Sequence, residues 1–307
     1  MIAALRERWI GWVAAMADRR SFDCVVVGGG SAGCVVAHRL VRAGRSVLLL
    51  EAGPSDDTRW IRMPATFVRV IGTARTWPYH TEPQAQAGGR TLHVPQGRTL
   101  GGGSSVNAMV YIRGARQDYD DWAAQGCSGW SWDDVLPAFK RAECNERLSE
   151  PLHGTDGPLR VTDGYRHPLS RAFVKAAQEA GLRYNDDFNG ERQDGVGFYQ
   201  STTFDGERGS TSATYLAAVR GDARLTVVTG AHVLRVVLRD GEARGVEYRR
   251  GDGATVAVDA RCEVILAAGA LASPKILQLS GIGPGSELQA LGIDVAHDLP
   301  GVGRNYQ

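Results

Sequence analysis

Residues 24–33, Cys-Val-Val-Val-Gly-Gly-Gly-Ser-Ala-Gly, decide the fold that this 307-residue chain can adopt. Three consecutive valines without polar alternation are typical of a strand buried on both faces. Gly28, Gly30 and Gly33 follow at the spacing G-x-G-x-x-G. In a strand–turn–helix unit the first glycine makes a tight turn, the second lets a pyrophosphate approach the backbone, and the third lets the helix pack on the strand. The stretch therefore predicts a dinucleotide-binding βαβ unit.

The residues that follow complete this unit. We predict a helix from Cys34 to Arg42, which would present its free N–H groups and the positive end of its dipole to phosphates. Gly44 ends the helix, and residues 45–50, Arg-Ser-Val-Leu-Leu-Leu, form a second strand. Glu51 ends that strand 18 positions after Gly33, where a carboxylate accepts hydrogen bonds from a ribose diol and repels a 2′-phosphate.

Charge and composition exclude several classes of protein. The net charge of +1 creates no overall field that would attract nucleic acid, so no nucleic-acid partner is expected. No run of about 18 apolar residues is present, so no integral membrane segment is expected. We assign four tryptophans to core or lid packing: Trp77, Trp122, Trp130 and Trp132.

The cysteines are five, scattered and without a C-x-x-C pair. This pattern predicts reduced, mostly buried thiols in a cytosolic protein, with neither a disulfide framework nor a zinc site. The residues are Cys24, Cys34, Cys127, Cys144 and Cys262.

Residues 1–20 form an amphipathic N-terminal extension, because Leu5, Trp9 and Met16 recur at helical spacing among charged residues. Such a helix could lie on a membrane surface or pack on the protein itself, or the start codon could be placed too far upstream. We expect a cytoplasmic protein, with peripheral attachment to the inner membrane as the alternative.

A second glycine-rich turn occurs at residues 97–109, Gly-Arg-Thr-Leu-Gly-Gly-Gly-Ser-Ser-Val-Asn-Ala-Met. Its bare backbone N–H groups and small hydroxyls could contact a planar or anionic ligand, although a flexible serine-capped turn is an equal alternative. We expect it to lead into a helix through Val110 to Arg113.

Five prolines make residues 54–96 irregular, and a long irregular stretch inside a domain is usually functional.

Later segments return the chain to the first sheet. We predict helices over residues 130–144 and 169–180, the second followed by Gly181. We predict strands over 225–229, 233–238 and 243–249, with Asp240-Gly241 as the hairpin turn between the last two. The apolar run 263–269 is a buried strand, and Ser273-Pro274 begins the next helix as N-cap and first helical residue.

Several of these stretches together resemble the glucose–methanol–choline (GMC) oxidoreductase family. Residues 97–114 are similar to its first motif, and residues 269–283 to its second. Residues 81–84 and 206–216 (Gly-Glu-Arg-Gly-Ser-Thr-Ser-Ala-Thr-Tyr-Leu) also resemble family stretches. Within the family the chain is most similar to the bacterial choline and alcohol dehydrogenase branch.

The resemblance implies an α/β fold. We expect an FAD-binding, Rossmann-like (doubly wound) domain with a small antiparallel β-meander, plus part of an α+β substrate domain. The FAD-binding domain would comprise residues 21–152 and 223–307, and residues 153–222 would form a partial substrate-binding region. The family binds FAD, whose second end needs a second close backbone approach. We expect Gly30 and Gly102 to contact opposite ends of this one ligand.

Motif matching assigns residues to parts of the cofactor. The diphosphate is expected to contact Gly28, Gly30, Ser31, Ala32 and Gly33. Glu51 is expected to hold the adenosine ribose, and the backbone of Val233 the adenine. The flavin is expected to contact Gly102, Gly103, Asn107, Ala108 and Val110. The remaining expected cofactor contacts are Ala52, Arg98, Met109 and Gly269. Val106 stands where some members carry a histidine bonded to the flavin, so non-covalent FAD is expected.

No catalytic residue can be carried over from the family. Its base is a histidine in the C-terminal half, and residues 299–307 here resemble a mid-sequence stretch. We therefore expect the chain to end mid-fold, which predicts poor solubility or weak FAD binding, and a C-terminal half that could be encoded separately. His80 and His93, near the second glycine turn, are the alternative candidates for a base.

Three functions remain open on this basis. The first is an FAD-dependent alcohol dehydrogenase that passes a hydride from a small-molecule alcohol to flavin N5 and then to an electron acceptor. The second is a truncated, non-catalytic remnant that binds FAD. The third is a nicotinamide enzyme that shares the first βαβ unit alone, against which the second glycine turn argues.

Overall fold

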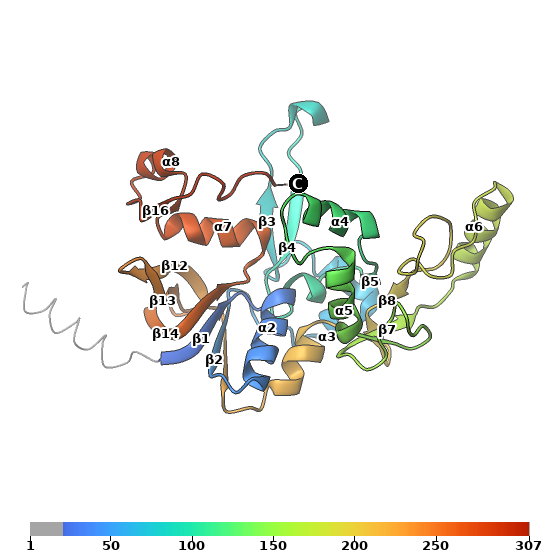
Figure 1. The fold of residues 1–307 in the computed structure, drawn as a ribbon, viewed down its shortest axis with the longest axis horizontal. Helices are drawn as coiled ribbons and strands as arrows, with labels where there is room; N and C mark the ends of the chain where they lie inside the picture. Colours follow the sequence, from blue (N-terminus) through green and yellow to red (C-terminus); the bar gives the residue numbers. More distant parts are fainter. Residues whose placement is uncertain (1–20, 307) are drawn as a thin grey trace, which may run out of the picture. The chain divides into compact units, whose positions relative to one another are not determined.

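The computed structural model describes residues 21–306 (Figure 1). These residues form two compact units. The first unit comprises residues 21–56, 72–103 and 216–306, and the second comprises 57–71 and 104–215. These boundaries differ from the segments 21–152, 153–222 and 223–307 expected from sequence. The predicted amphipathic extension, residues 1–20, lies outside the described residues.

A six-stranded sheet forms the centre of the first unit, in the order β11-β2-β1-β14-β13-β12. Its strands are β1 (Ser21–Val27), β2 (Val47–Glu51), β11 (Leu225–Thr229), β12 (His232–Arg239), β13 (Glu242–Arg249) and β14 (Thr255–Leu266). The first four strands in this order pair in parallel, whereas β14, β13 and β12 form an antiparallel meander. The long strand β14 therefore joins the parallel sheet to the meander.

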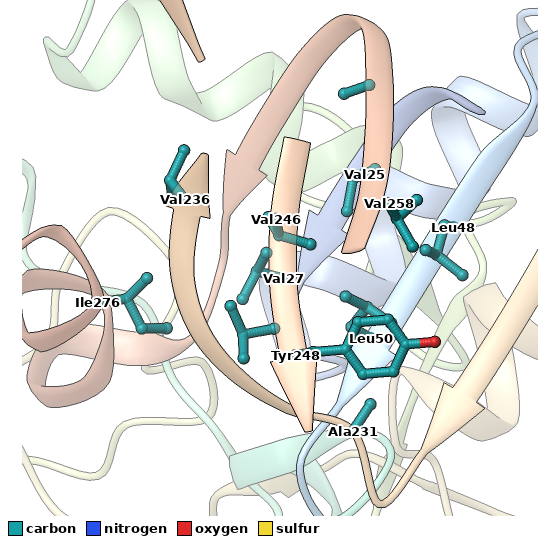
Figure 2. Close-up of a cluster of buried hydrophobic side chains, with 12 residues drawn as sticks. Val25, Val27, Leu48, Leu50, Ala231, Val236, Val246, Tyr248, Val258 and Ile276 are labelled. Carbon is teal, nitrogen blue, oxygen red and sulfur yellow. The ribbon is translucent and has the colours of Figure 1, made fainter. Parts of the chain in front are cut away.

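Alternate residues of the parallel strands pack on opposite faces of this sheet. Val25 pairs with Leu48 on one side and with Val264 on the other. Figure 2 shows Val25 and Leu48 in a buried cluster with side chains of the meander and with Ile276. The opposite face packs on helix α2 (Ser31–Arg42) through a second buried cluster. The parallel part of the sheet is thus covered by the meander on one face and by α2 on the other.

The remaining elements of the first unit frame the same sheet. They are a hairpin of β3 (Thr76–His80) and β4 (His93–Gly97), the 3₁₀ helices η2 (Ala85–Ala87) and η5 (Ala217–Val219), helices α7 (Gly269–Leu279) and α8 (Gly285–Ala290), and the short pair β15 (Ile282–Gly283) and β16 (His297–Asp298). Helix α7 packs against β12, as its place beside the meander in Figure 1 indicates.

The second unit is built on a four-stranded sheet in the order β5-β8-β7-β6. These strands are β5 (Val110–Tyr111), β8 (Gln200–Ser201), β7 (Leu159–Asp163) and β6 (Glu143–Asn145). Its other elements are α3 (Arg59–Arg62), η1 (Pro64–Arg69), α4 (Arg116–Ala124), α5 (Trp132–Ala142), α6 (Pro168–Glu179), β9 (Thr203–Phe204) and β10 (Glu207–Arg208). Helix η3 (Gly102–Ser105) begins in the first unit and ends in the second, and the π-helix η4 (Ser212–Leu216) ends at the first residue of a first-unit segment.

A buried charged cluster lies in the second unit. The Arg113 guanidinium donates to Glu143, whose other oxygen lies 2.9 Å from Nδ1 of His153. Nε2 of His153 lies 3.0 Å from Asp187 Oδ2. Burial alone would lower the pKa of His153, but its hydrogen bonds to Asp187 and Glu143 and their charges raise it to about 9. His153 is therefore charged at neutral pH and joins two carboxylates.

Most predicted elements are confirmed. The two parallel strands around α2, the strands of the meander and helices α5 and α6 all occur within a few residues of the expected bounds. Asp240 and Gly241 have φ angles of 54° and 77°, as a tight hairpin turn requires. Ser131 occupies the N-cap of α5 as its sequence indicated, and its backbone N–H and its hydroxyl both donate to Asp134 Oδ2.

Three secondary-structure predictions are wrong. The expected helix from Val110 to Arg113 is the strand β5, because Met109 has a left-handed φ of 62° that ends any helix there. Helix α7 begins at Gly269, and Pro274 lies inside it instead of starting it. Residues 54–96 are not irregular throughout, because 76–80 pair with 93–97 as a hairpin. Pro78 and Pro95 are opposite each other there, and a two-stranded hairpin tolerates proline at its edges.

Two burial predictions need correction as well. Cys24 and Cys34 are buried, but Cys127 and Cys262 are exposed. All five cysteines are free thiols, as expected. Among the tryptophans, Trp132 is buried whereas Trp122 and Trp130 are exposed. Across residues 21–306, no helix combines the length and the apolar character that a membrane span needs.

Candidate functional site

The candidate site lies at the carboxyl ends of the parallel strands in the first unit. A pocket of about 480 Å³ opens there. Its lining includes Val27 at the end of β1, Glu51 at the end of β2, and Leu266 at the end of β14. Open α/β sheets bind their ligands at this edge, because the loops and helix N-termini that follow the strands converge on it.

The first glycine turn has the geometry that its sequence predicted. Gly28 has a φ of 100°, and a Cβ atom on it would lie 2.5 Å from the carbonyl oxygen of Ala267. A Cβ atom on Gly33 would lie 1.8 Å from the carbonyl oxygen of Gly28, so glycine alone allows α2 to approach the strand this closely. No side chain caps α2 at Gly30, and its first turn has no acidic residue. The N-terminus of α2 is therefore suited to an anion.

The second glycine turn lies directly against the first. The N–H of Gly101 donates to the carbonyl oxygen of Gly29 at 2.7 Å. A Cβ atom on Gly102 would lie 2.6 Å from the Cα of Gly30. Both Gly30 and Gly102 line the pocket, so one ligand could contact both. Because their backbones are in contact, Gly30 and Gly102 can contact adjacent parts of a ligand, and not its opposite ends as expected.

Glu51 is a buried carboxylate with defined partners. Its Oε2 accepts from the N–H of Gly29 at 2.8 Å, and its Oε1 accepts from the N–H of Gly53 at 2.7 Å. Burial raises the pKa of Glu51, while these N–H groups and the charge of Arg98 oppose the rise. Each oxygen keeps capacity for a further hydrogen bond, so Glu51 can both brace the turn and accept from a ligand hydroxyl.

One wall of the pocket is aromatic and carries positive charge. The rings of Trp77 and Tyr79 stack with centroids 5.7 Å apart, and the Trp77 ring meets the His232 ring edge-on at 6.0 Å. The Arg98 guanidinium carbon lies 4.8 Å, and Lys275 Nζ 5.7 Å, from the centroid of the Trp77 ring. Among the described residues, Nε of Arg98 is buried without a hydrogen-bond partner.

Sequence reasoning missed most of this wall. It assigned Trp77 to core or lid packing and gave no role to Lys275 or Tyr79. A signal was present, because Trp77 and Tyr79 alternate as residues of a strand do, but the prolines beside them favoured an irregular segment. Lys275 lies on α7, which returns to the pocket from the far end of the chain.

The structure brings together most of the predicted cofactor contacts. Those that line the pocket are Gly28, Gly30, Ser31, Ala32, Glu51, Ala52, Gly102, Gly103, Val233 and Gly269. Gly33 and Arg98 do not line the pocket: Gly33 packs on Gly28, and the Arg98 guanidinium lies over the Trp77 ring. The predicted flavin contacts Asn107, Ala108 and Val110, and the further predicted cofactor contact Met109, belong to the second unit. Within that unit Asn107, Ala108 and Val110 are exposed, whereas Met109 is buried.

The histidines offer no evident catalytic base. His80 and His93, the two candidates, are exposed cross-strand neighbours whose rings stack at 4.9 Å, and neither lines the pocket. His232 does line it, but burial and the charges of Lys275, Arg249 and Arg98 lower its pKa. Within the part of the chain that the structure describes, no group of acidic, histidine and cysteine side chains could hold a metal ion.

The residues present fit a dinucleotide cofactor. Glycine turns allow close approach to a diphosphate, an uncapped helix N-terminus and two cationic side chains favour its charge, and a carboxylate stands where a ribose would lie. A pocket of about 480 Å³ with an aromatic wall is of the size and character of ligand sites in general.

Comparisons with known proteins agree with this description. The sequence profile of the family "GMC oxidoreductase" matches residues 22–307. The chain is 44% identical over 292 residues to an oxygen-dependent choline dehydrogenase of Photobacterium profundum. The aligned region covers 94% of this chain and 51% of that protein. It is 43% identical over 291 residues to an alcohol dehydrogenase [acceptor] of Pseudomonas putida, with coverage of 93% and 53%.

A solved structure supports the same fold. An FAD-dependent oxidoreductase from Chaetomium thermophilum superposes with a TM-score of 0.85 at 34% identity, over 91% of this chain and 51% of that one. The chain thus spans about half the length of the curated relatives that it matches.

Proposed function

The chain belongs to the GMC oxidoreductase family, and we propose that it binds FAD non-covalently in the pocket of the first unit and serves in the oxidation of a small alcohol. One observation carries this proposal: two glycine turns from distant parts of the sequence meet in backbone contact at the carboxyl edge of a parallel sheet. A single nucleotide turn would suffice for a nicotinamide cofactor.

Each part of the cofactor is assigned to residues that suit it. The diphosphate is proposed to contact Gly28, Gly30, Ser31 and Ala32, with Gly33 supporting the turn. Glu51 would accept from the ribose, while Ala52 and the backbone of Val233 would border the adenine. Arg98 would contribute charge over the Trp77 ring, and Gly269 would leave space at the start of α7. The flavin is assigned to Gly102, Gly103, Asn107, Ala108 and Val110, and Met109 remains a proposed cofactor contact.

Bound flavin would supply the hydride acceptor, N5, for a CH–OH donor. This chain's own residues would bind and orient the cofactor and limit the access of water to it. The segments 21–56, 72–103 and 216–306 are proposed as the main FAD-binding part, and the second unit, apart from the proposed cofactor contacts at 107–110, as a partial substrate region. No residue of the chain is proposed as the catalytic base.

Non-covalent binding is supported by the surroundings of Val106. Its side chain is buried with Ile61 and Val70 in an apolar cluster of the second unit, and it has no nucleophilic atom. If the chain is saturated with FAD and then precipitated with acid, the flavin should remain in the supernatant. Yellow colour that stays with the washed precipitate would contradict this part of the proposal.

A titration tests the proposed function. The purified chain is mixed with increasing FAD, and in parallel with NAD⁺, while flavin absorption and fluorescence and protein fluorescence are recorded. We expect FAD to bind and NAD⁺ to bind at least tenfold more weakly. A chain that binds NAD⁺ and ignores FAD would overturn the proposal and favour a nicotinamide enzyme.

Turnover is tested separately, with choline and simple alcohols as donors and a dye as electron acceptor. Reduction of the dye would support alcohol oxidation by this chain. FAD binding without reduction by any donor would favour the second candidate, a non-catalytic FAD-binding protein. In the lining drawn from the described residues His232 is the one histidine, and no catalytic role is assigned to it, which favours that candidate for the isolated chain.

A further inference from the structure

Arg208 is a buried cation that the proposed function does not use. It lies on β10, within the stretch 206–216, and is 3% exposed. No carboxylate contributes to its pKa, which burial lowers to about 10, so the guanidinium is charged at neutral pH without an acidic partner. A buried charge without a counter-ion is costly and calls for a specific reason.

The guanidinium of Arg208 donates its hydrogen bonds to backbone carbonyl oxygens and to one side-chain amide oxygen. Its Nε donates to the carbonyl oxygen of Ile61 at 2.9 Å. Its Nη1 donates to the carbonyl oxygens of Ser104 at 3.1 Å and Asn107 at 2.8 Å, and to Asn107 Oδ1 at 2.9 Å. Among the described residues, Nη2 is buried and has no hydrogen-bond partner. Arg208 therefore concentrates its contacts on the segment that follows the second glycine turn.

These contacts determine the orientation of the Asn107 amide. A guanidinium can only donate, so the Asn107 atom that faces it must be the oxygen. The same Oδ1 also accepts from the N–H of Met109 at 3.1 Å. The amide nitrogen of Asn107 is thereby turned away from Arg208, on a residue that is exposed within its unit. Its two N–H groups are available to a ligand.

The turn held in this way is strained. Met109 has a φ of 62°, a conformation that residues with a side chain rarely adopt and that costs on the order of tenfold in equilibrium population or more. It persists because its N–H binds Asn107 Oδ1 and its carbonyl oxygen accepts from the N–H of Thr202 at 2.8 Å. Strained turns that neighbours over-determine are concentrated at ligand sites.

We propose that Arg208 is a positioning residue that fixes the Asn107 amide and the left-handed turn at Met109, and so presents the Asn107 N–H groups to the flavin. This inference rests on the proposed binding of FAD. It assigns Arg208 no contact with the cofactor, because the effect passes through Asn107.

The test compares Arg208→Met and Arg208→Lys with the control Arg160→Met, which removes an exposed arginine of the same unit. Affinity is measured for FAD and for ADP, since ADP would occupy the first-unit pocket alone. We expect Arg208→Met to weaken FAD about tenfold and to shift the visible absorption of bound flavin, with ADP affinity unchanged. Arg208→Lys should recover part of the loss, and Arg160→Met should match the wild type.

A double-mutant cycle tests the route through Asn107. Asn107→Ala changes an exposed side chain and should fold even if Arg208→Met does not. We expect Asn107→Ala to weaken FAD as Arg208→Met does, and the double variant to be no weaker than either single one. Additive losses would overturn the inference, as would equal losses of FAD and ADP affinity or unchanged FAD affinity and flavin spectrum in Arg208→Met.

Hydrogen exchange separates this inference from the proposed function. In the protein without FAD, the N–H of Met109 should exchange faster in Arg208→Met and Asn107→Ala than in wild type. A wild-type chain that binds no FAD would refute the proposed function and the flavin role together, even with this exchange difference. A chain that binds FAD but shows no exchange difference would refute the inference alone.

Discussion

Gly30 and Gly102 are in backbone contact, although 72 positions separate them in the chain. A Cβ atom on Gly102 would lie 2.6 Å from the Cα of Gly30, and Gly102 has a left-handed φ of 52°. Glycine is therefore required there both by space and by backbone conformation. The contact joins the two turns that border the pocket, and it makes the second turn a structural part of the first unit.

Gly102→Ala should damage both stability and binding. The left-handed backbone conformation and the clash with Gly30 together predict a loss of about 1–2 kcal/mol or more in the free energy of unfolding. FAD affinity should fall more than tenfold, because the turns separate. Urea unfolding and an FAD titration measure the two effects.

The matched control for this change is Gly221→Ala. Gly221 belongs to the same unit, and no atom lies within 4 Å of a Cβ built on it. It should change the free energy of unfolding by less than about 0.5 kcal/mol. Equal behaviour of the two variants would show that the contact between the turns has no energetic weight.

Glu51→Gln should weaken FAD and the turn together. A glutamine places an NH₂ group against the N–H of Gly29 or of Gly53, since both donate to the carboxylate in the native protein. One donor is left unsatisfied, which predicts a loss of about 1–3 kcal/mol in stability. FAD affinity should fall about tenfold by equilibrium titration. The exposed Glu263→Gln serves as control, and a Glu51 variant indistinguishable from it would contradict the assignment.

Trp77→Ala should weaken both FAD and ADP, because the ring forms the wall beside His232 and Val233 in the first unit. The loss of an aromatic contact predicts about a tenfold fall in affinity for either ligand, and Trp77→Phe should retain most of it. Trp122→Ala removes an exposed tryptophan of the second unit and should leave ADP affinity unchanged. Isothermal titration calorimetry with ADP measures the affinity of both variants. An equal loss of ADP affinity in Trp122→Ala would show that the loss in Trp77→Ala is not specific to the pocket wall.

His153 predicts a pH dependence of stability. Its pKa in the folded protein is about 9, above the ordinary value of 6.5. The stabilisation is therefore fully present below about pH 6.5 and is lost as the pH rises through 9. With a side chain only 3% exposed, the loss is on the order of 3 kcal/mol. Urea unfolding at both ends of this range measures it.

Two further measurements isolate this histidine. His297→Gln, an exposed control, should keep the pH dependence, whereas His153→Gln should remove most of it. If His153→Gln does not fold, the titration of His153 in the wild type can be followed by NMR. A folded-state pKa at or below 6.5 would contradict the charged bridge between Glu143 and Asp187.

Several features of the fold could be predicted from local sequence. The glycine spacing at 28–33, the apolar strands on either side of α2 and the Asp240-Gly241 hairpin each depend on neighbouring residues, and all are present in the structure. The strand at Val110 could not be recognised, because the conformation of Met109 that ends the helix depends on Thr202, far along the chain. Pro274 indicated a helix start, but α7 had already begun at Gly269, shortly after the end of β14 at Leu266.

The amino-acid sequence by itself determined the first glycine turn, the continuous apolar runs of the buried parallel strands and the absence of a nucleophile at Val106, because each follows from residue types within a few positions of one another. Only the tertiary structure decided which distant segments meet: Gly102 against Gly30, Lys275 beside Trp77, and Arg208 on Asn107. These contacts depend on how helices and strands pack, and no local pattern encodes which oxygen a buried guanidinium will reach.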